Sequence, residues 1–147
     1  MGRRLDRWRA LSWHQRGILI RCAVGVSIIH AALAMLGYTR LRRLIERCSR
    51  HPQPRPATEA DVLQARELAR LAAMAGRQAV GEAACLRRSL HIYGVLRRRG
   101  LRPVLQIGVG PQTGTFQAHA WVELEGTPLL DSDVGFRPFE RRDPSSS

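Results

Sequence analysis

The sequence predicts an α+β protein in which a helical first half is followed by one more helix and an antiparallel sheet. Apolar residues recur at helical spacing up to about residue 99, and from residue 105 onward they alternate with a period of two. Helices that precede strands in this way are typical of the α+β class. The 147 residues are enough for one compact domain with a core of its own, without a disulfide or metal ion to hold it together.

The composition limits the kinds of function. With 44% hydrophobic and 24% charged residues, the chain is neither wholly disordered nor fibrous. Its net charge is +12, and all 24 basic residues are arginines, which suit carboxylate, phosphate and acidic peptide partners. The three cysteines, Cys22, Cys48 and Cys85, form no CxxC motif and no Cys/His cluster. We therefore expect no metal site and no disulfide, and a reducing, cytoplasmic setting.

The first helical region is predicted at residues 5–48, as two helices that break near Gly37. Its apolar stretch Ile18–Leu36 is interrupted by Arg21 and His30. Since a bilayer span needs roughly 20 apolar residues, we predict a buried helix, with membrane association as the alternative.

Two cysteines and two tryptophans of this region also carry predictions. Cys22 and Cys48 lie in apolar helical contexts and are predicted as small core residues. Trp8 and Trp13 flank an arginine-rich start, and they indicate either helix packing or contact with a membrane interface.

A proline-rich segment separates this region from the rest of the chain. His51–Pro56 cannot continue a helix, and Thr58 with Asp61 has the spacing of a capping box, although Glu or Gln is preferred at the second position. The helix that begins there is predicted to run toward Ala75, with Gly76 closing it. The expected organisation is a helical region at 1–50, a linker at 51–57, a core domain at 58–143 and a frayed tail at 144–147.

The second half is predicted as one helix and a meander. The helix Cys85–Arg99 carries arginines in its last turn and is stopped by Gly100. Period-two alternation then predicts strands at 105–109 and 116–124, separated by a Gly/Pro loop at 110–114. Glu125 and Gly126 form a tight-turn signal, and the returning strand is expected at 127–131.

A cysteine and a histidine of this half are placed for nucleophilic chemistry. If Ala118, Ala120 and Val122 face the core, His119 and Trp121 face the other, more accessible side of the strand. Cys85 opens a helix, where unpaired N–H groups and the positive end of the dipole favour a thiolate. A helix-borne cysteine, a strand-borne histidine and an acid on the next strand make up a papain-like site.

The identity of the acid depends on the turn. A two-residue turn places Ser132 opposite His119 and leaves Asp131 on the other face of the strand. A three-residue turn that includes Thr127 places Asp133 opposite His119, with Asp131 diagonal to it on the same face. Asp131 and Asp133 are therefore both candidates.

Four segments of the second half carry a resemblance to a known family. They are Cys85–Leu90, Leu96–Leu101, Ile107–Val109 and Ala118–Glu123, the last of which reads AHAWVE. These segments resemble the lasso-peptide B proteins, which are transglutaminase-like, papain-fold leader peptidases. The resemblance is dense from Cys85 to Asp131, and the segment 136–139 also fits.

The resemblance implies a specific reaction. Cys85 would attack the peptide bond between leader and core of a small ribosomal precursor, with His119 as general base. In the family an aspartate that follows the histidine at the spacing of Asp131 orients it, which selects Asp131 over Asp133. The freed core amine would then be joined to a side-chain carboxylate by a separate ATP-dependent, asparagine-synthetase-like cyclase. The leader peptidase itself would need no cofactor.

Some family members carry a leader-recognition domain in front of the protease. The first half of this chain has a helical pattern instead, so the resemblance implies the split form, which takes its substrate from a separate recognition protein. Gln78, Arg88 and Trp121 are candidates for oxyanion stabilisation or substrate contact. Gln78 and Arg88, like Arg87, are also consistent with plain solvated positions, and Trp121 with simple packing on its strand.

Two other classes of function remain as alternatives. An acyl-transferring enzyme of the same fold would resolve the thioester with an amine instead of water. A basic nucleic-acid- or membrane-binding module would fit the charge of +12, but no nucleic-acid recognition motif is present and aromatic residues make up only 5%. We therefore predict a cytoplasmic leader peptidase that does not bind nucleic acid, with peripheral membrane contact left open.

Overall fold

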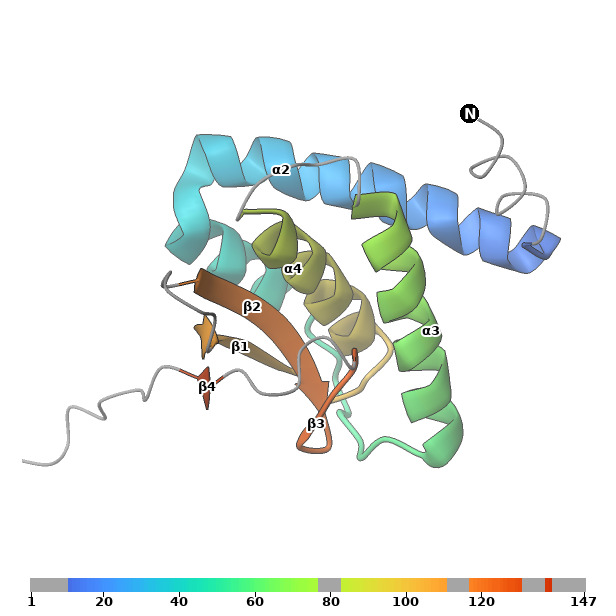
Figure 1. The fold of residues 1–147 in the computed structure, drawn as a ribbon. Coiled ribbons are helices and arrows are strands. Elements are labelled where there is room, and N and C mark those ends of the chain that lie inside the picture. Colours follow the sequence, from blue (N-terminus) through green and yellow to red (C-terminus); the bar gives the residue numbers. More distant parts are fainter. Residues whose placement is uncertain (1–10, 77–82, 111–116, 131–136, 139–147) are drawn as a thin grey trace, which may run out of the picture.

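The computed structural model describes residues 11–76, 83–110, 117–130 and 137–138. Within them lie helices α2 (Trp13–Cys48), α3 (Glu59–Gly76) and α4 (Ala83–Arg98). The strands are β1 (Val104–Gly110), β2 (Gln117–Leu124), β3 (Thr127–Pro128) and β4 (Arg137–Pro138), in the antiparallel order β3-β2-β1-β4. In Figure 1, α4 lies between the sheet on one side and helices α2 and α3 on the other. The predicted α+β class is confirmed.

Helix α2 begins at a capping box that sequence analysis did not single out. The Ser12 hydroxyl accepts from the Gln15 backbone N–H, and the Gln15 side chain accepts from the Ser12 N–H. The predicted break near Gly37 is confirmed, because this glycine has φ 71° and ψ 168° inside the helix. The second part of α2 turns there toward α4 (Figure 1), where a Cβ atom on Gly94 would lie 3.1 Å from Cγ2 of Ile45.

The prediction of a buried helix at Ile18–Leu36 is wrong. Cys22 and Val26 are buried against the rest of the protein, but the opposite side of the helix is exposed. In length and composition α2 could cross a membrane, and only 6% of its most apolar window is buried. Cys22 is a core residue as predicted, whereas Cys48 is exposed. Helical spacing identified an apolar helix but not that only one side of it would be covered.

The segment between α2 and α3 has no regular secondary structure, yet it is held in place. The Arg55 N–H donates to the Gly100 carbonyl at 2.8 Å, and the Ala57 N–H donates to Oε1 of Glu125 at 2.8 Å. The capping box predicted at Thr58 and Asp61 is confirmed. Each side-chain oxygen accepts the other residue's backbone N–H, at 2.9 and 3.3 Å.

The core is built around α4. Leu90 and Leu96 are fully buried, and they belong to a cluster with Leu68 of α3 and with Val122 and Leu124 of β2. The helix ends at Arg98, and the stop predicted at Gly100 is confirmed, because the φ of 78° at Gly100 lets the chain leave the helix. The Leu101 N–H donates to the Leu96 carbonyl at 3.2 Å across this end. The predicted alternation holds for Ala120, Val122 and Leu124, but Ala118 is exposed.

The turn between β2 and β3 contains two residues. Leu124 pairs with Thr127, and Glu125 and Gly126 both have positive φ. The three-residue alternative is therefore excluded. Strand β3 ends at Pro128, and the next residue keeps its register, because the Leu129 N–H donates to the Val122 carbonyl at 3.1 Å. Both candidate aspartates lie outside the described residues. Strand β4, which sequence analysis did not anticipate, pairs with the other edge of the sheet at Gly108 and Val109.

Candidate active site

Cys85 is the third residue of α4, so its thiol lies in the first turn of that helix, as predicted. Unpaired backbone N–H groups and the positive end of the helix dipole are found at this position. The residue is half-buried. A partly shielded thiol at a helix N-terminus is the environment in which cysteines become nucleophilic.

His119 approaches this thiol from β2. It lies opposite Gly108 of β1, a residue without a side chain, and its ring stacks beside the indole of Trp121 with centroids 6.1 Å apart and planes 14° apart. His119 and Cys85 are joined by a side-chain hydrogen bond. The structure therefore brings together the two residues that the sequence predicted as nucleophile and base.

The surroundings of Cys85 act on its pKa in opposite directions. Burial raises the pKa of the thiol, but hydrogen bonds with the His119 side chain and with the Ala120 backbone, the charge of His119 and a further backbone hydrogen bond with Leu86 lower it. The net effect holds the pKa of Cys85 below its ordinary value. Two of the effects that lower the pKa come from His119, so the thiolate form of Cys85 depends on its contact with that residue.

Ser89 fixes α4 against β2 next to the site. One helical turn after Cys85, its buried hydroxyl donates to the Ala120 carbonyl at 2.9 Å. This bond ties the helix that carries the cysteine to the strand that carries the histidine, one residue beyond His119. Sequence analysis missed Ser89, although a serine next to the apolar residues Leu86 and Leu90 of a predicted helix is a visible signal.

The side of β2 that carries His119 is less accessible than predicted. Trp121 is only 2% exposed, and its Nε1–H donates to Oε1 of Glu123 at 2.8 Å. Oε2 of the same carboxylate lies 3.3 Å from the Gln106 Nε2, which donates to it. His119, Trp121 and Glu123 thus share one side of the strand as predicted. The indole of Trp121 is buried between the other two side chains, stacked beside the His119 ring and hydrogen-bonded to Glu123.

Of the other candidate residues, Arg88 and Arg87 are half-buried on α4 beside Cys85. Nε of Arg87 is buried and has no hydrogen-bond partner among the described residues. Gln78, Asp131 and Asp133 lie outside the described residues. The parts of the chain that the structure covers contain no group of three or more His, Cys, Asp or Glu side chains that could hold a metal ion.

Comparison with known proteins places the chain in a family. No curated protein and no solved structure matches the chain. The family model of the Transglutaminase-like superfamily matches residues 25–141, which include α3, α4, the sheet, Cys85 and His119. This family implies cysteine-dependent hydrolase or transferase chemistry. Since the match covers most of its length, the chain belongs to the transglutaminase-like superfamily.

Proposed function

We propose that this protein is a cysteine peptidase that removes the leader from a ribosomally made lasso-peptide precursor. The observation that carries the proposal is the hydrogen-bonded pair of Cys85 on the first turn of α4 and His119 on β2. The resemblance of the segments around both residues to the lasso-peptide B proteins supports the choice of substrate.

The mechanism follows from the pair. The Cys85 sulfur attacks the carbonyl carbon of the bond between leader and core, and His119 holds the thiol proton. When the tetrahedral intermediate collapses, the carbon–nitrogen bond breaks and the imidazolium gives this proton to the departing core amine. A water molecule, deprotonated by His119, then hydrolyses the thioester and frees the leader carboxylate. Asp131 orients His119 in this proposal, on the strength of the family spacing. This role requires the chain to leave the register of the β2–β3 pair before Asp131, because the two-residue turn would otherwise place Asp131 on the other face of the strand.

The proposal includes two protein partners. A separate recognition protein presents the leader, and an asparagine-synthetase-like cyclase uses the core amine that the peptidase frees. All three act in the reducing cytoplasm, where a catalytic thiol stays reduced.

Intact mass spectrometry of the precursor, incubated with this protein and the recognition protein, tests the proposal. We expect one cut at the junction of leader and core, with the two products together heavier than the precursor by one water. Cys85→Ala and His119→Ala should abolish the cut. Cys48→Ala should leave it unchanged, because that cysteine is exposed at the last residue of α2.

Three results would contradict the proposal. An uncut precursor, with the recognition protein shown to be bound, would argue against peptidase activity. Cleavage by Cys85→Ala would mean that another group is the nucleophile. A product that has lost ammonia and gained an amine partner would identify the acyl-transfer alternative of the same family.

A further inference from the structure

We propose that the first part of α2 lies flat on an anionic membrane surface, with its exposed apolar side in the acyl region of the lipid. The outer face of α2, as we call this side, consists of five side chains at helical spacing that are 53–86% exposed: Trp13, Ile20, Val24, Ile28 and Met35. They recur every seven or four residues, so they form one stripe along the helix.

The opposite side of the same helix decides how it meets the membrane. Cys22 and Val26 are buried against the rest of the protein, and Gly25 packs so closely on α4 that a Cβ atom there would collide with the His91 ring. A helix held in this way cannot leave the domain to span a bilayer. It can lie in the plane of the interface, with the domain occupying the water side.

The length of the outer face suits this orientation. From Trp13 to Met35 the stripe runs about 33 Å along the helix axis. Each end carries a group that prefers a membrane interface. At the start, the Arg16 guanidinium lies 5.0 Å from the centre of the Trp13 ring. At the other end the chain turns at Gly37 toward α4 (Figure 1), and Arg40 is the first exposed arginine after this turn.

Charge favours an anionic membrane over other occupants. The chain carries +12, and the acidic residue of α2, Glu46, is paired with Arg42 at 3.0 Å. A second copy would bring the same positive charge to the contact and would be repelled. Nucleic acid would pair its phosphates with the arginines, but it would leave the apolar side chains of the outer face in water. An anionic bilayer interacts favourably with both groups. Its acyl chains cover the apolar side chains, and each basic residue near its charged surface contributes about 1 kcal/mol to the free energy of binding.

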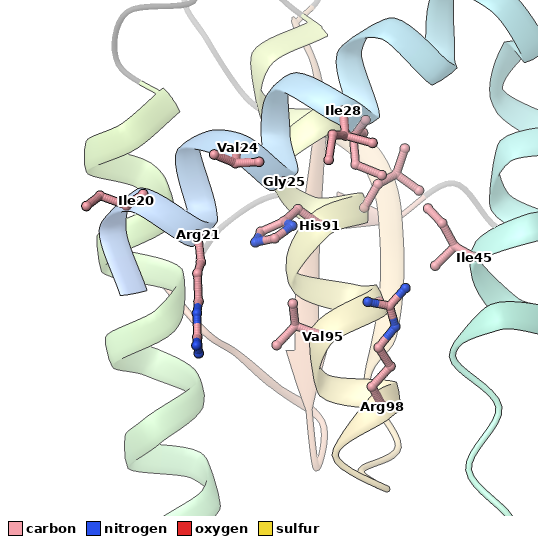
Figure 2. Close-up of a pocket in the computed structure, with 12 residues that line it drawn as sticks. Ile20, Arg21, Val24, Gly25, Ile28, Ile45, His91, Val95 and Arg98 are labelled. Atoms are coloured by element: carbon pink, nitrogen blue, oxygen red, sulfur yellow. The ribbon is translucent and has the colours of Figure 1, made fainter. Parts of the chain in front are cut away.

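A groove beside the outer face adds a place for a lipid chain. It has a volume of about 500 Å³ and lies between the two parts of α2 and helix α4. Ile20, Val24 and Ile28 belong both to the outer face and to this groove. Figure 2 shows Arg21 and Arg98 on either side of His91 in the groove. An acyl chain could thus occupy the apolar part while the lipid phosphate contacts an arginine.

Vesicle flotation tests this proposal. We expect the protein to float with vesicles of phosphatidylcholine and phosphatidylglycerol, less with phosphatidylcholine alone, and less at high salt. The triple variant Ile20→Ser, Val24→Ser, Ile28→Ser should lose about tenfold or more in partitioning, given the free energy of burying three such side chains. The matched control is Leu63→Ser with Val104→Ser, which removes exposed apolar side chains from α3 and β1 and should float like the unaltered protein.

A second measurement covers the case in which the triple variant does not fold. The chain has three tryptophans, Trp8, Trp13 and Trp121, so this measurement starts from a Trp8→Phe variant. Brominated lipid should quench the fluorescence of that variant, and the added change Trp13→Phe should remove most of the quenching, because the remaining Trp121 is buried inside the domain. Absence of flotation, equal flotation of the triple variant and the control, or quenching that Trp13→Phe leaves intact would each overturn the proposal. So would a lipid-free dimer, seen by light scattering, that the triple variant abolishes.

The membrane proposal and the proposed function are tested independently, so one can be contradicted while the other holds. The triple variant leaves Cys85 and His119 unaltered, and it should cleave the precursor in lipid-free solution at the rate of the unaltered protein. Conversely, Cys85→Ala should float normally while cutting nothing.

Discussion

At the residue scale, the three cysteines of the chain differ in their surroundings. His119 and two backbone hydrogen bonds outweigh burial at Cys85 and lower its pKa. Burial raises the pKa of Cys22 to about 11, with a smaller opposing effect of Arg99. Cys48 is exposed. The same side chain is thus a nucleophile candidate, a core residue and a surface residue at three positions of one small protein.

These differences predict a pattern of thiol alkylation. In the folded protein iodoacetamide should modify Cys85 and Cys48 while Cys22 stays protected, because Cys22 is both buried and protonated. Since only the thiolate reacts and the pKa of Cys85 is lowered, the rate at Cys85 should rise at a lower pH than that of an ordinary thiol. In His119→Ala the rise should move to higher pH. Peptide mass mapping across pH gives each rate, and an unmoved profile in His119→Ala would contradict the pair.

The third member of the site can be assigned by two substitutions. Asp131→Ala should reduce cleavage while leaving residual activity above that of His119→Ala, since an orienting acid can be lost with part of the rate retained. Asp133→Ala should have the smaller effect. The comparison is made on kcat/KM with the same precursor. If Asp133→Ala is the more damaging change, Asp133 is the acid and the family spacing does not hold here.

At the element scale, the start of α3 depends on a local cluster of hydrogen bonds. Arg55 donates to Asp61 from both terminal nitrogens, at 2.6 and 3.0 Å, and Asp61 and Thr58 cap each other. These bonds, first that of Arg55 and then those of Thr58, hold the pKa of Asp61 well below its usual range. Because the folded-state pKa is depressed, the stabilisation is present at neutral pH and is lost as pH falls through the carboxylate range.

Thermal unfolding of Asp61→Asn tests this cluster. We expect a Tm lower by a few degrees at pH 7, and a difference that shrinks below about pH 4, where the aspartate of the unfolded chain also holds its proton. Thr58→Ala should lower the Tm in the same direction. Glu59→Gln removes a charge from the same first turn without removing these capping bonds, and it should have a smaller effect. A Tm difference independent of pH would contradict the electrostatic part of the argument.

At the scale of the whole molecule, α4 connects the parts. It packs against α2, α3, β1 and β2, and it carries both Cys85 and the core residue Leu96. The site is therefore placed by the same helix that forms the centre of the core. Loss of core packing on α4 would affect stability and the position of the thiol together.

Two leucine substitutions measure this dependence. Leu96 is fully buried in the core cluster, so Leu96→Ala should reduce the free energy of unfolding by about 2–5 kcal/mol. Leu63 is exposed on α3, and Leu63→Ala should change it by less than about 0.5 kcal/mol. Urea unfolding gives both values. Equal effects at the two positions would mean that α4 is not the centre of the core.

Much of this molecule follows from local sequence signals. The break at Gly37, the cap at Thr58 and Asp61 and the stop at Gly100 all depend on neighbouring residues and are visible in the sequence. A tight turn at Glu125 and Gly126 is visible too, but the sequence left two and three residues open as its length, and the pairing of Leu124 with Thr127 decided it. The position of Cys85 in the first turn of its helix, which begins at Ala83, and the strand position of His119 follow from local sequence patterns in the same way. Local sequence signals also predicted Cys85 as the nucleophile and His119 as the base.

Tertiary structure decided which faces are covered. Periodicity shows which residues share a side of a helix or strand, but coverage depends on elements that are distant in the sequence. For this reason Trp121 is buried on the side of β2 predicted to be accessible, and α2 is exposed where burial was predicted. The packing of α4 on β2 likewise brings Cys85 to His119, residues 34 positions apart whose meeting no local pattern specifies.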